Sequence, residues 1–254
     1  MLYREYPPHP ALSAHVDCMW TARAPAVVPG RTHTHRVLPD NCVDILWQDG
    51  GRPAFAVGMM STAIQVASAG PVRTVAVRFK PGAAGAFLAT PLHALTDQRA
   101  DIDLLWGRGD ADRLADALWT NELTDRARLA LIETQLLRRL RAADPGAAAG
   151  EALIRRALGA LDASGGGVRI DELAARLGVS RQHLAAQFRT RVGLSPKLYA
   201  RICRFRLATA ALKAAPTPDW ARLALDCGYF DQSHLIHDFQ EFAGSAPERF
   251  LRAA

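Results

Sequence analysis

The sequence predicts an α+β fold in two parts, a β-rich N-terminal domain and an all-α C-terminal domain. Short apolar runs between residues 36 and 80 are separated by Gly, Ser and Pro, which is typical of strands joined by turns. From about residue 83 the apolar residues recur at helical spacing. Towards the C-terminus a helical motif occurs twice, which indicates one supersecondary unit used twice.

The predicted strands cover residues 43–47, 54–57, 64–66 and 72–79. The first is followed by Gln48-Asp49-Gly50-Gly51, a strong turn signal. The last alternates β-branched residues with others, as a half-buried strand does, and Lys80-Pro81-Gly82 ends it. We therefore expect strands first and helices afterwards in the N-terminal domain.

A long amphipathic helix is predicted from residue 125 to 141. Its apolar stripe has spacings of 3, 4 and 4 residues and consists of Leu129, Ile132, Leu136 and Leu140. The stripe either caps the N-terminal domain or pairs with its copy in a homodimer, and the sequence leaves both interpretations open.

Residues 144–150, Asp-Pro-Gly-Ala-Ala-Ala-Gly, form the most linker-like stretch of the chain. We place the domain boundary there, with a sensor or dimerisation domain at residues 1–143 and a second domain at residues 151–254. A short helix at 151–161 is expected to open the second domain. The Gly-rich residues 163–167 follow it as a second flexible point.

The repeated motif starts with a Leu-Ala-x-x-x-Gly run at residues 173–178 and again at 223–228, an offset of 50 (223 − 173). From His183, which matches His234, the offset is 51 (234 − 183), and Phe188, Gly193 and Pro196 recur with it. Each copy indicates a short helix, a Gly-containing turn and a second helix, which is a helix-turn-helix unit. Two such units predict two helices that enter successive major grooves of DNA.

In the first unit, residues 171–177 form the supporting helix and residues 181–192 the reading helix. Ser180 is the expected N-cap, and Gly193 suits the left-handed residue after a helix end. Leu184 and Phe188 face the core. The expected DNA contacts are the cap and the outward residues, Ser180, Arg181, Gln182, Ala185, Ala186 and Arg189. Gln pairs with adenine and Arg with guanine or phosphate, whereas the two alanines carry no hydrogen-bond code.

In the second unit, Asp231 is the expected N-cap, and Gln232, Ser233 and His237 face outward as further DNA contacts. Because acidic residues in this helix oppose phosphate binding, it either engages DNA weakly or serves as a scaffold. For His183 and its counterpart in this unit we favour a shared structural role over metal ligation.

The helix between the two units is predicted from residue 197 to 215, where Pro216 stops it. A rigid helix here fixes the distance between the two reading helices. Its Lys197 and Arg201 are expected DNA contacts.

Positive charge gathers in the first unit. The whole chain has a net charge of +6, and residues 168–213 alone hold 10 Lys and Arg against 2 Asp and Glu, or +8 (10 − 2). Residues 214–254 hold 3 against 6, or −3 (3 − 6). The first unit therefore has the charge of a polyanion-binding surface. The alternative, a basic helix that is merely solvated, stays open.

These paired motifs identify a family resemblance. They comprise residues 173–184, Phe188, residues 193–196, residues 204–208, and residues 227–235 with Pro247. With them, residues 150–254 resemble the AraC/XylS family of bacterial transcription regulators. The resemblance implies a seven-helix domain with two helix-turn-helix units on a linking helix. The base-facing positions that it implies are Gln182, Ala185, Ala186, Gln232, Ser233 and His237.

Residues 36–47 together with 77–83 look like the uncharacterised β-rich N-terminal domain of a subset of this family. By that analogy the N-terminal domain is a small barrel-like sensor. Asp44, Trp47 and Arg78 are candidate effector-binding residues, because polar groups on otherwise apolar strands often point at a ligand. The alternative is ordinary surface charge and a core aromatic residue.

His33 and His35, with Asp40 and Cys42 close by, suggest a metal site, but they lie in a loop-like segment and a third ligand would have to be guessed. We predict no metal. The four cysteines have no CxxC spacing, which fits reduced thiols. Asp40 and Asp44 would raise the pKa of the Cys42 thiol, so a buried thiol is favoured over a reactive sensor.

The sequence thus predicts a cytoplasmic one-component transcription regulator and leaves open whether it is an activator or a repressor. It would bind double-stranded DNA at a promoter and respond to a small-molecule effector or to homodimerisation. We expect no catalytic constellation, no cofactor, no signal peptide and no membrane-spanning run. Two other functions stay open. One is a cupin-like small-molecule or metal-binding protein held on nucleic acid by its basic half, and the other is a ligand-independent architectural DNA-binding protein.

Overall fold

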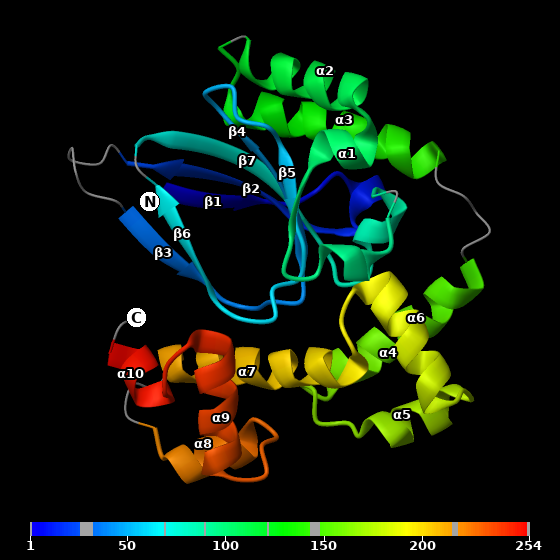
Figure 1. Cartoon of the computed structure of the whole chain (residues 1–254), viewed down its shortest axis with the longest axis vertical. Coiled ribbons are helices and arrows are strands. Elements are labelled where there is room, and N and C mark those ends of the chain that lie inside the picture. Colours follow the sequence, from blue (N-terminus) through cyan, green and yellow to red (C-terminus); the bar gives the residue numbers. More distant parts are fainter. Residues whose placement is uncertain are drawn as a thin grey trace.

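The computed structural model describes residues 2–25, 33–68, 70–88, 90–120, 122–142, 148–214 and 218–252. Figure 1 shows two β-sheets with covering helices on one side of the molecule and a group of helices, joined by one long helix, on the other. The α+β class predicted from the sequence is confirmed. No helix within the described ranges is long and apolar enough to cross a bilayer.

The N-terminal part is built from antiparallel strands. The larger sheet has the order β1-β2-β7-β4-β5-β8, and β3 pairs with β6 in a separate two-stranded sheet. The strands of the described residues are β1 (Leu2–Tyr6), β2 (Val16–Ala24), β3 (His33–Val37), β4 (Val43–Gln48), β5 (Phe55–Val57), β6 (Ile64–Ser68), β7 (Val72–Phe79) and β8 (Arg99–Asp101). The six-stranded sheet is open and does not close into a barrel.

The four predicted strands correspond to β4, β5, β6 and β7. The sequence did not predict β1, β2, β3 or β8. The loop predicted around residues 33–35 is wrong, because these residues form one edge of the β3–β6 pair, with His35 opposite Val66.

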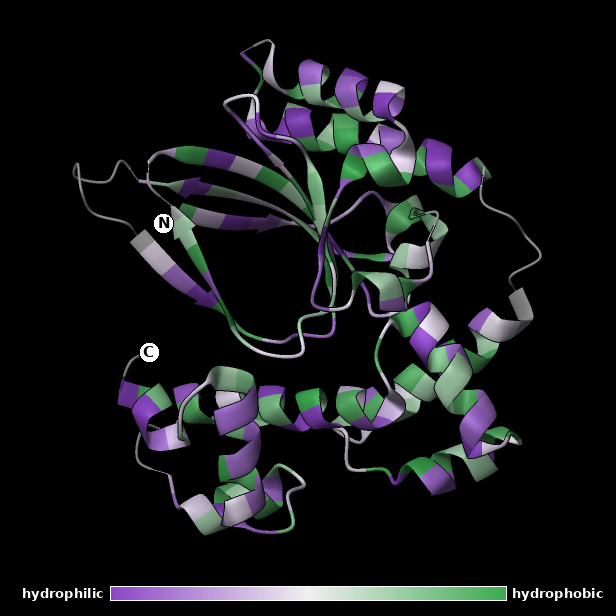
Figure 2. Cartoon of the chain, in the orientation of Figure 1, coloured by the Kyte–Doolittle hydropathy of each residue, from purple (hydrophilic) through white to green (hydrophobic). Residues whose placement is uncertain are grey.

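The two faces of the six-stranded sheet have different surroundings. Side chains alternate along β4, so that Ile45 and Trp47 are buried on one face while Asp44 and Leu46 are half-buried on the other. Figure 2 shows this alternation of hydrophobic and hydrophilic residues along the strands. Helices cover the first face, and Figure 1 shows the β3–β6 sheet on the opposite side. We call this second face the inner face.

The covering helices follow the strands in the chain, as predicted. They are α1 (Ile102–Trp106), α2 (Arg108–Trp119) and α3 (Asp125–Ala142), with the short 3-10 helices η1 (Pro10–Leu12), η2 (Ala84–Ala86) and η3 (Leu92–Leu95) at the edges. Leu129, Ile132 and Leu136 of α3 are buried, so α3 caps the N-terminal sheet. Arg128, which lies off this stripe, is buried as well, and its Nε donates a hydrogen bond to the Leu118 carbonyl at 2.9 Å.

The C-terminal part is all-helical, and the seven-helix architecture implied by the resemblance is confirmed within the described residues. The helices are α4 (Ala148–Ala163), α5 (Ile170–Leu177), α6 (Arg181–Val192), α7 (Pro196–Ala214), α8 (Trp220–Asp226), α9 (Gln232–Ala243) and α10 (Pro247–Arg252). Figure 1 shows α5 with α6 at one end of α7, and α8 with α9 at the other. The predicted stop at Pro216 lies outside the described residues.

The predicted domain boundary falls largely on residues 143–147, which also lie outside the described residues; α4 begins at Ala148, three positions (151 − 148) before its predicted start. The two parts are in direct contact. Thr96 Oγ1 donates a hydrogen bond to the Gly193 carbonyl at 2.7 Å, and a Cβ on Gly82 would lie 3.1 Å from the Leu158 side chain. The second flexible point is a tight turn, since a Cβ on Gly166 would lie 2.0 Å from the Ala200 carbonyl oxygen.

Candidate nucleic-acid interface

The first helix-turn-helix unit consists of α5, a tight turn and α6. Gly178 ends α5 with a φ of 71°, a left-handed conformation that glycine adopts without strain. Ser180 caps α6, and its hydroxyl accepts a hydrogen bond from the His183 backbone N–H at 3.1 Å. Gly193 ends α6 with a φ of 91°. The reading helix therefore has the bounds, the cap and the terminator that the sequence predicted.

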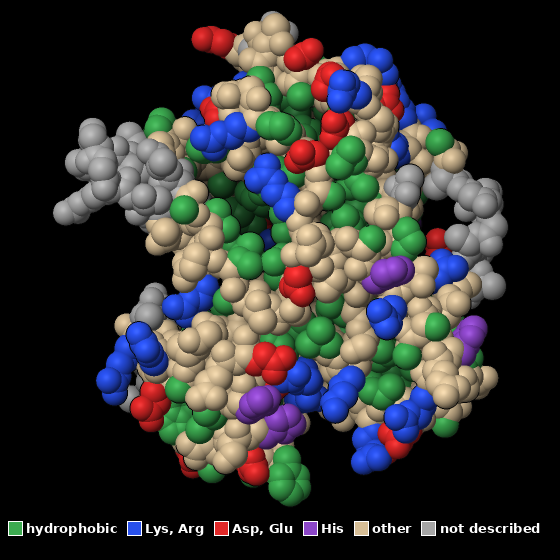
Figure 3. Space-filling view, in the orientation of Figure 1, with side chains coloured by type: hydrophobic (Ala, Val, Ile, Leu, Met, Phe, Trp, Pro, Cys, Tyr) green, Lys and Arg blue, Asp and Glu red, His purple; other side chains and the backbone are tan. Residues whose placement is uncertain are grey.

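The reading helix α6 has one buried and one exposed side. Leu184, Phe188 and Val192 are buried. The residues predicted to face outward are exposed or half-buried: Arg181, Gln182, Ala186 and Arg189 are exposed, and Ala185 is half-buried. Figure 3 shows Lys and Arg side chains gathered over this end of the molecule.

A groove of about 560 Å³ runs along the start of α6. It is lined by Ile170, Ser180, Arg181, Gln182, Ala185, Ser195, Pro196 and Lys197. The Ser195 hydroxyl accepts a hydrogen bond from the Leu198 backbone N–H at 3.2 Å, so the N-terminus of α7 opens here beside that of α6. Helix N-termini carry partial positive charge, and Arg181 and Lys197 add full charges. The groove can thus hold an anionic backbone. Sequence reasoning missed Ser195, although a Ser before Pro196 at a helix start is a capping signal.

The second unit repeats this design. The Asp219 carboxylate caps α8 by accepting hydrogen bonds from the Ala221 and Arg222 backbone N–H groups, both at 3.1 Å. The Asp231 carboxylate caps α9 by accepting one from the His234 backbone N–H at 2.8 Å. The outward residues are exposed, namely Gln232, Ser233 and His237.

The two repeated histidines occupy the same capping position. In each unit the backbone N–H of the histidine, His183 or His234, is the group bound by the N-cap side chain. The imidazoles differ: His183 is exposed, whereas His234 is half-buried and its ring lies 5.2 Å from that of Tyr229. The two histidines thus share a capped backbone position, and their imidazoles share no environment.

Arg201, a predicted DNA contact, is engaged in ion pairs within the protein. Its guanidinium pairs with Asp238 at 2.6 Å and with Glu241 at 2.5 Å, and it lies 4.8 Å from the Phe242 ring centre. Asp238 is fully buried, so Arg201 neutralises a charge that water does not reach. The predicted DNA contact at Arg201 stays a prediction, but in the structure its side chain joins α7 to α9. The outward residue Lys197 on the same helix stays exposed.

On the inner face, two of the candidate effector residues are neighbours. Arg78 of β7 lies opposite Asp44 of β4, with Nε 3.3 Å from Oδ1, and Nη2 3.5 Å from Asp40 Oδ2. Trp20 of β2 donates its indole N–H to Asp44 at 2.8 Å. Burial raises the pKa of Asp44 to about 6, although Arg78 acts in the opposite sense. Burial tends to lower the pKa of Arg78, but the two carboxylates outweigh it and raise that pKa.

Trp47, the third candidate, lies on the other face of the sheet. It is buried, and its ring lies 5.9 Å from the Trp106 ring. The grouping of Trp47 with Asp44 and Arg78 is therefore corrected, because residues three apart on a strand point to opposite faces. Trp20 is the aromatic residue beside the charged pair.

The four cysteines are all buried and unpaired. Burial raises the pKa of Cys18 to about 12 and that of Cys42 well above its usual value. The predicted buried thiol at Cys42 is thus confirmed in its environment. Within the described ranges, no three His, Cys, Asp or Glu side chains come together as a metal site would require.

Comparison with known families adds two matches. Residues 173–253 match a helix-turn-helix domain, and residues 4–101 match a domain of unknown function (DUF6597). The resemblance of the C-terminal part is thereby confirmed: residues 173–253 form an AraC-type helix-turn-helix domain, a DNA-binding unit of transcription regulators. No curated protein shows significant similarity to the chain.

Several solved structures have a distant likeness to the chain. ToxT from Vibrio cholerae O395 is 10% identical over 91% of this chain and 95% of its own, with a TM-score of 0.45. ToxT bound to (E)-4-(8-methylnaphthalen-1-yl)but-3-enoic acid is 11% identical over 91% and 97%, with a TM-score of 0.46. The C-terminal domain of AraT, a response regulator from Geobacillus stearothermophilus, is 22% identical over 40% and 85%, with a TM-score of 0.38.

Proposed function

We propose that the chain is a one-component regulator that recognises a specific promoter sequence through its two helix-turn-helix units. One observation carries the proposal. The exposed Arg181 and Gln182 of α6 line a groove into which the N-termini of two helices open, and Arg189 is exposed further along the same helix. This arrangement combines phosphate binding, which positions a protein on DNA, with side chains that read base edges.

The two units differ in what they offer to DNA. The first carries the positive charge, and its groove suits a phosphate group. The second unit presents Gln232, Ser233 and His237 on α9. This helix also carries acidic residues, and His237 lies 3.5 Å from Glu241. We infer that the first unit supplies most of the affinity and that the second adds sequence preference.

For the N-terminal part we propose that the inner face binds a small-molecule effector beside Asp44, Arg78 and Trp20. A charged pair that is only partly screened by neighbours is a specific anchor for a polar ligand. The side chains of Arg78 and Asp44 are 26% and 15% exposed. Such a regulator would act as an activator or a repressor in the bacterial cytoplasm, as a monomer or a homodimer.

DNA binding by the full chain tests this function. Fluorescence anisotropy would compare the DNA upstream of its own gene with a scrambled fragment, in a salt series from low to physiological concentration. We expect tighter binding to the native fragment, with an affinity that falls as salt rises. If the chain bound both fragments equally at every salt concentration, its DNA binding would rest on charge alone, and the proposed sequence recognition would be overturned.

The effector proposal has a separate test. A panel of small polar metabolites would be screened by the shift that each causes in the melting temperature of the chain. A compound that binds the inner face should stabilise the wild type and lose that effect in Arg78→Met. A compound that stabilises both proteins equally would bind elsewhere.

A further inference from the structure

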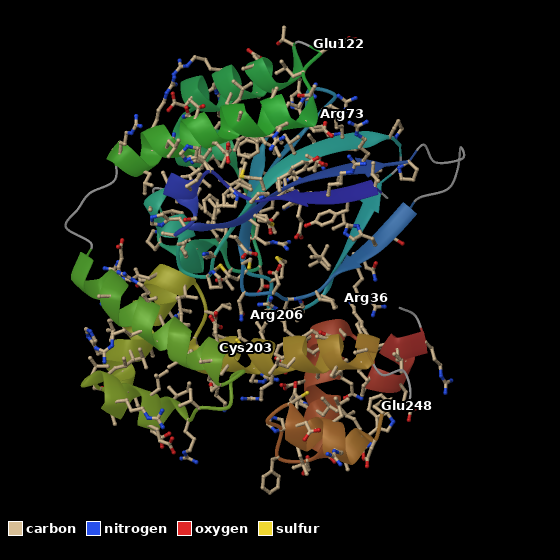
Figure 4. All side chains as sticks on the ribbon, turned by 180° about the vertical axis from the view of Figure 1, so that it is seen from behind. Arg36, Arg73, Glu122, Cys203, Arg206 and Glu248 are labelled. Carbon is tan, nitrogen blue, oxygen red and sulfur yellow. The ribbon has the colours of Figure 1, made fainter. Side chains whose placement is uncertain are left out.

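The turn formed by residues 40–42 lies between the inner face and α7. Arg206 of α7 donates a hydrogen bond from Nη1 to the Asp40 carbonyl at 3.2 Å. The Asn41 side chain donates from Nδ2 to the Tyr199 carbonyl at 3.4 Å and lies 3.6 Å from Cys203 Sγ. Figure 4 shows Cys203 and Arg206 on the side of α7 that faces the N-terminal sheets. The 40–42 turn therefore holds the middle of the helix that connects the two DNA-binding units.

The same turn is joined to the charged group of the inner face. Asp40 accepts a hydrogen bond from the Cys42 backbone N–H at 3.0 Å, which fixes the turn, and its other carboxylate oxygen lies 3.5 Å from Arg78. Arg78 also pairs with Asp44. Of the two carboxylates, Asp40 is the more exposed, at 30% against 15%, and the more distant. It is the partner that a ligand on the inner face displaces more readily.

In the 40–42 turn, Asn41 has a left-handed backbone and one side-chain oxygen without a hydrogen bond to any described residue. Asn41 is 1% exposed and has a φ of 66°, a left-handed backbone that Asn tolerates better than most residues. Its Nδ2 is bonded, but its buried Oδ1 has no hydrogen-bond partner among the described residues. A buried polar atom without a partner costs free energy, so the contacts that hold this turn in place offset a penalty at Asn41.

We propose that the 40–42 turn couples the inner face to α7, so that a ligand which engages Arg78 changes how α7 is held. The inference rests on the proposed effector site and names its route of regulation. When Arg78 leaves Asp40, the turn loses its anchor on the sheet, and the Asn41 and Arg206 contacts to α7 weaken with it. Because α7 separates α6 from α9, a change in its docking alters how both reading helices meet DNA.

Hydrogen exchange of the full chain tests the coupling without ligand or DNA. Arg78→Met removes the guanidinium from the inner face without touching α7. We expect the backbone amides of residues 199–206 to exchange about fivefold faster or more, the range of a typical coupling free energy. In the double variant Asn41→Gly/Arg206→Ala, where the turn no longer reaches α7, adding Arg78→Met should cause no further increase. Gly is chosen at position 41 because it keeps the positive φ.

Two controls guard against simple loss of stability. Arg99→Met removes another cation of the sheet, one that lies 3.5 Å over the Phe55 ring, and should leave residues 199–206 unchanged. Arg206→Ala alone changes an exposed residue, and by reciprocity it should speed exchange at residues 42–45. The coupling would be overturned if Arg78→Met left the exchange rates of residues 199–206 unchanged. It would also be overturned if Arg78→Met raised these rates equally in the wild type and in the Asn41→Gly/Arg206→Ala variant. Exchange is read without DNA, so failure of promoter binding would reject the proposed function separately.

Discussion

Residues of the same type perform different tasks in this chain, and their surroundings decide which. Arg189 and Arg201 both lie in the basic segment, and the sequence predicted a DNA contact for each. Arg189 is exposed on the reading helix, whereas Arg201 is enclosed by Asp238 and Glu241. A basic side chain on a helix therefore predicts affinity for DNA only where it is not already paired with a carboxylate of another helix.

Replacing these two arginines should separate DNA binding from stability. Arg189→Ala should weaken binding to native and scrambled DNA alike and flatten the salt dependence by about one unit of slope, with little change in unfolding free energy. Arg201→Ala leaves the buried Asp238 without its partner and should lower the unfolding free energy by about 3–5 kcal/mol. Anisotropy and urea denaturation measure the two effects. Similar stability losses in both variants would contradict the assignment.

Asp44 should make stability depend on pH in a defined window. Its pKa is about 6 in the folded chain against 3.8 for an ordinary Asp, so the folded state holds the proton more tightly. The resulting stabilisation is complete below pH 3.8 and is lost as pH rises through 6. Between pH 4 and 7, wild type should lose up to about 3 kcal/mol relative to Asp44→Asn, since one pKa unit is about 1.4 kcal/mol. Urea denaturation across this pH range measures the unfolding free energy of both proteins. If the difference between wild type and Asp44→Asn stays constant with pH, the raised pKa of Asp44 is refuted.

Among the elements, those with local signals were predictable. The bounds of α6, its Ser180 cap and its Gly193 terminator follow from short-range patterns, because capping involves residues only three or four apart. The same holds for β4, whose alternation is visible in the sequence. β7 was predicted as a half-buried strand, but residues 74–77 are buried on both faces because β2 and β4 flank it in the middle of the sheet. The helix-turn-helix motif recurs in the second unit, and this repetition strengthened the prediction of both units.

Elements defined by distant partners were not predictable. β1 is exposed along most of its length, and β2 is recognisable only once β1 and β7 pair with it on either side. For the candidate sites the same limit applies. The ion pair of Arg201 was not foreseen because Asp238 lies 37 positions away in the chain, and Trp20 was missed because Asp44 is 24 positions away. Trp47 was misplaced because strand alternation was not carried through from Asp44.

The reading helices should differ in what they recognise. Gln182→Ala should change the preference at one base pair by about 1–3 kcal/mol, because Gln binds adenine through two hydrogen bonds. Gln232→Ala, at the start of α9, should act at a different base pair, about one helical turn or 34 Å of DNA away. Binding to a library of single-base variants of the native fragment measures both. If Gln232→Ala changes no position, the second unit serves only as a scaffold.

At the scale of the whole molecule, the two units are held differently. The end of α6 is fixed against the N-terminal part through the Gly193 carbonyl, which accepts the hydrogen bond from Thr96. In the second unit, Gly244 occupies the equivalent repeat position and ends α9 with a φ of 68°. A Cβ on Gly193 would lie 1.8 Å from Met59 Cε and 2.9 Å from the Leu92 carbonyl oxygen, whereas a Cβ on Gly244 would meet nothing within 4 Å. The N-terminal part thus packs closely against the first unit at Gly193, whereas Gly244 of the second unit has no such contact with the described residues.

This asymmetry yields a matched pair of substitutions. Both Gly193→Ala and Gly244→Ala place a side chain at a left-handed helix end, which costs about 1–2 kcal/mol. Gly193→Ala must in addition displace Met59 and the Leu92 backbone, at about 1–3 kcal/mol more. Urea denaturation should therefore show the larger loss for Gly193→Ala, and limited proteolysis should show faster cleavage between the two parts in that variant only. Equal losses and equal cleavage would mean that the N-terminal part does not grip α6, and regulation of DNA binding would then have to pass through α7 alone.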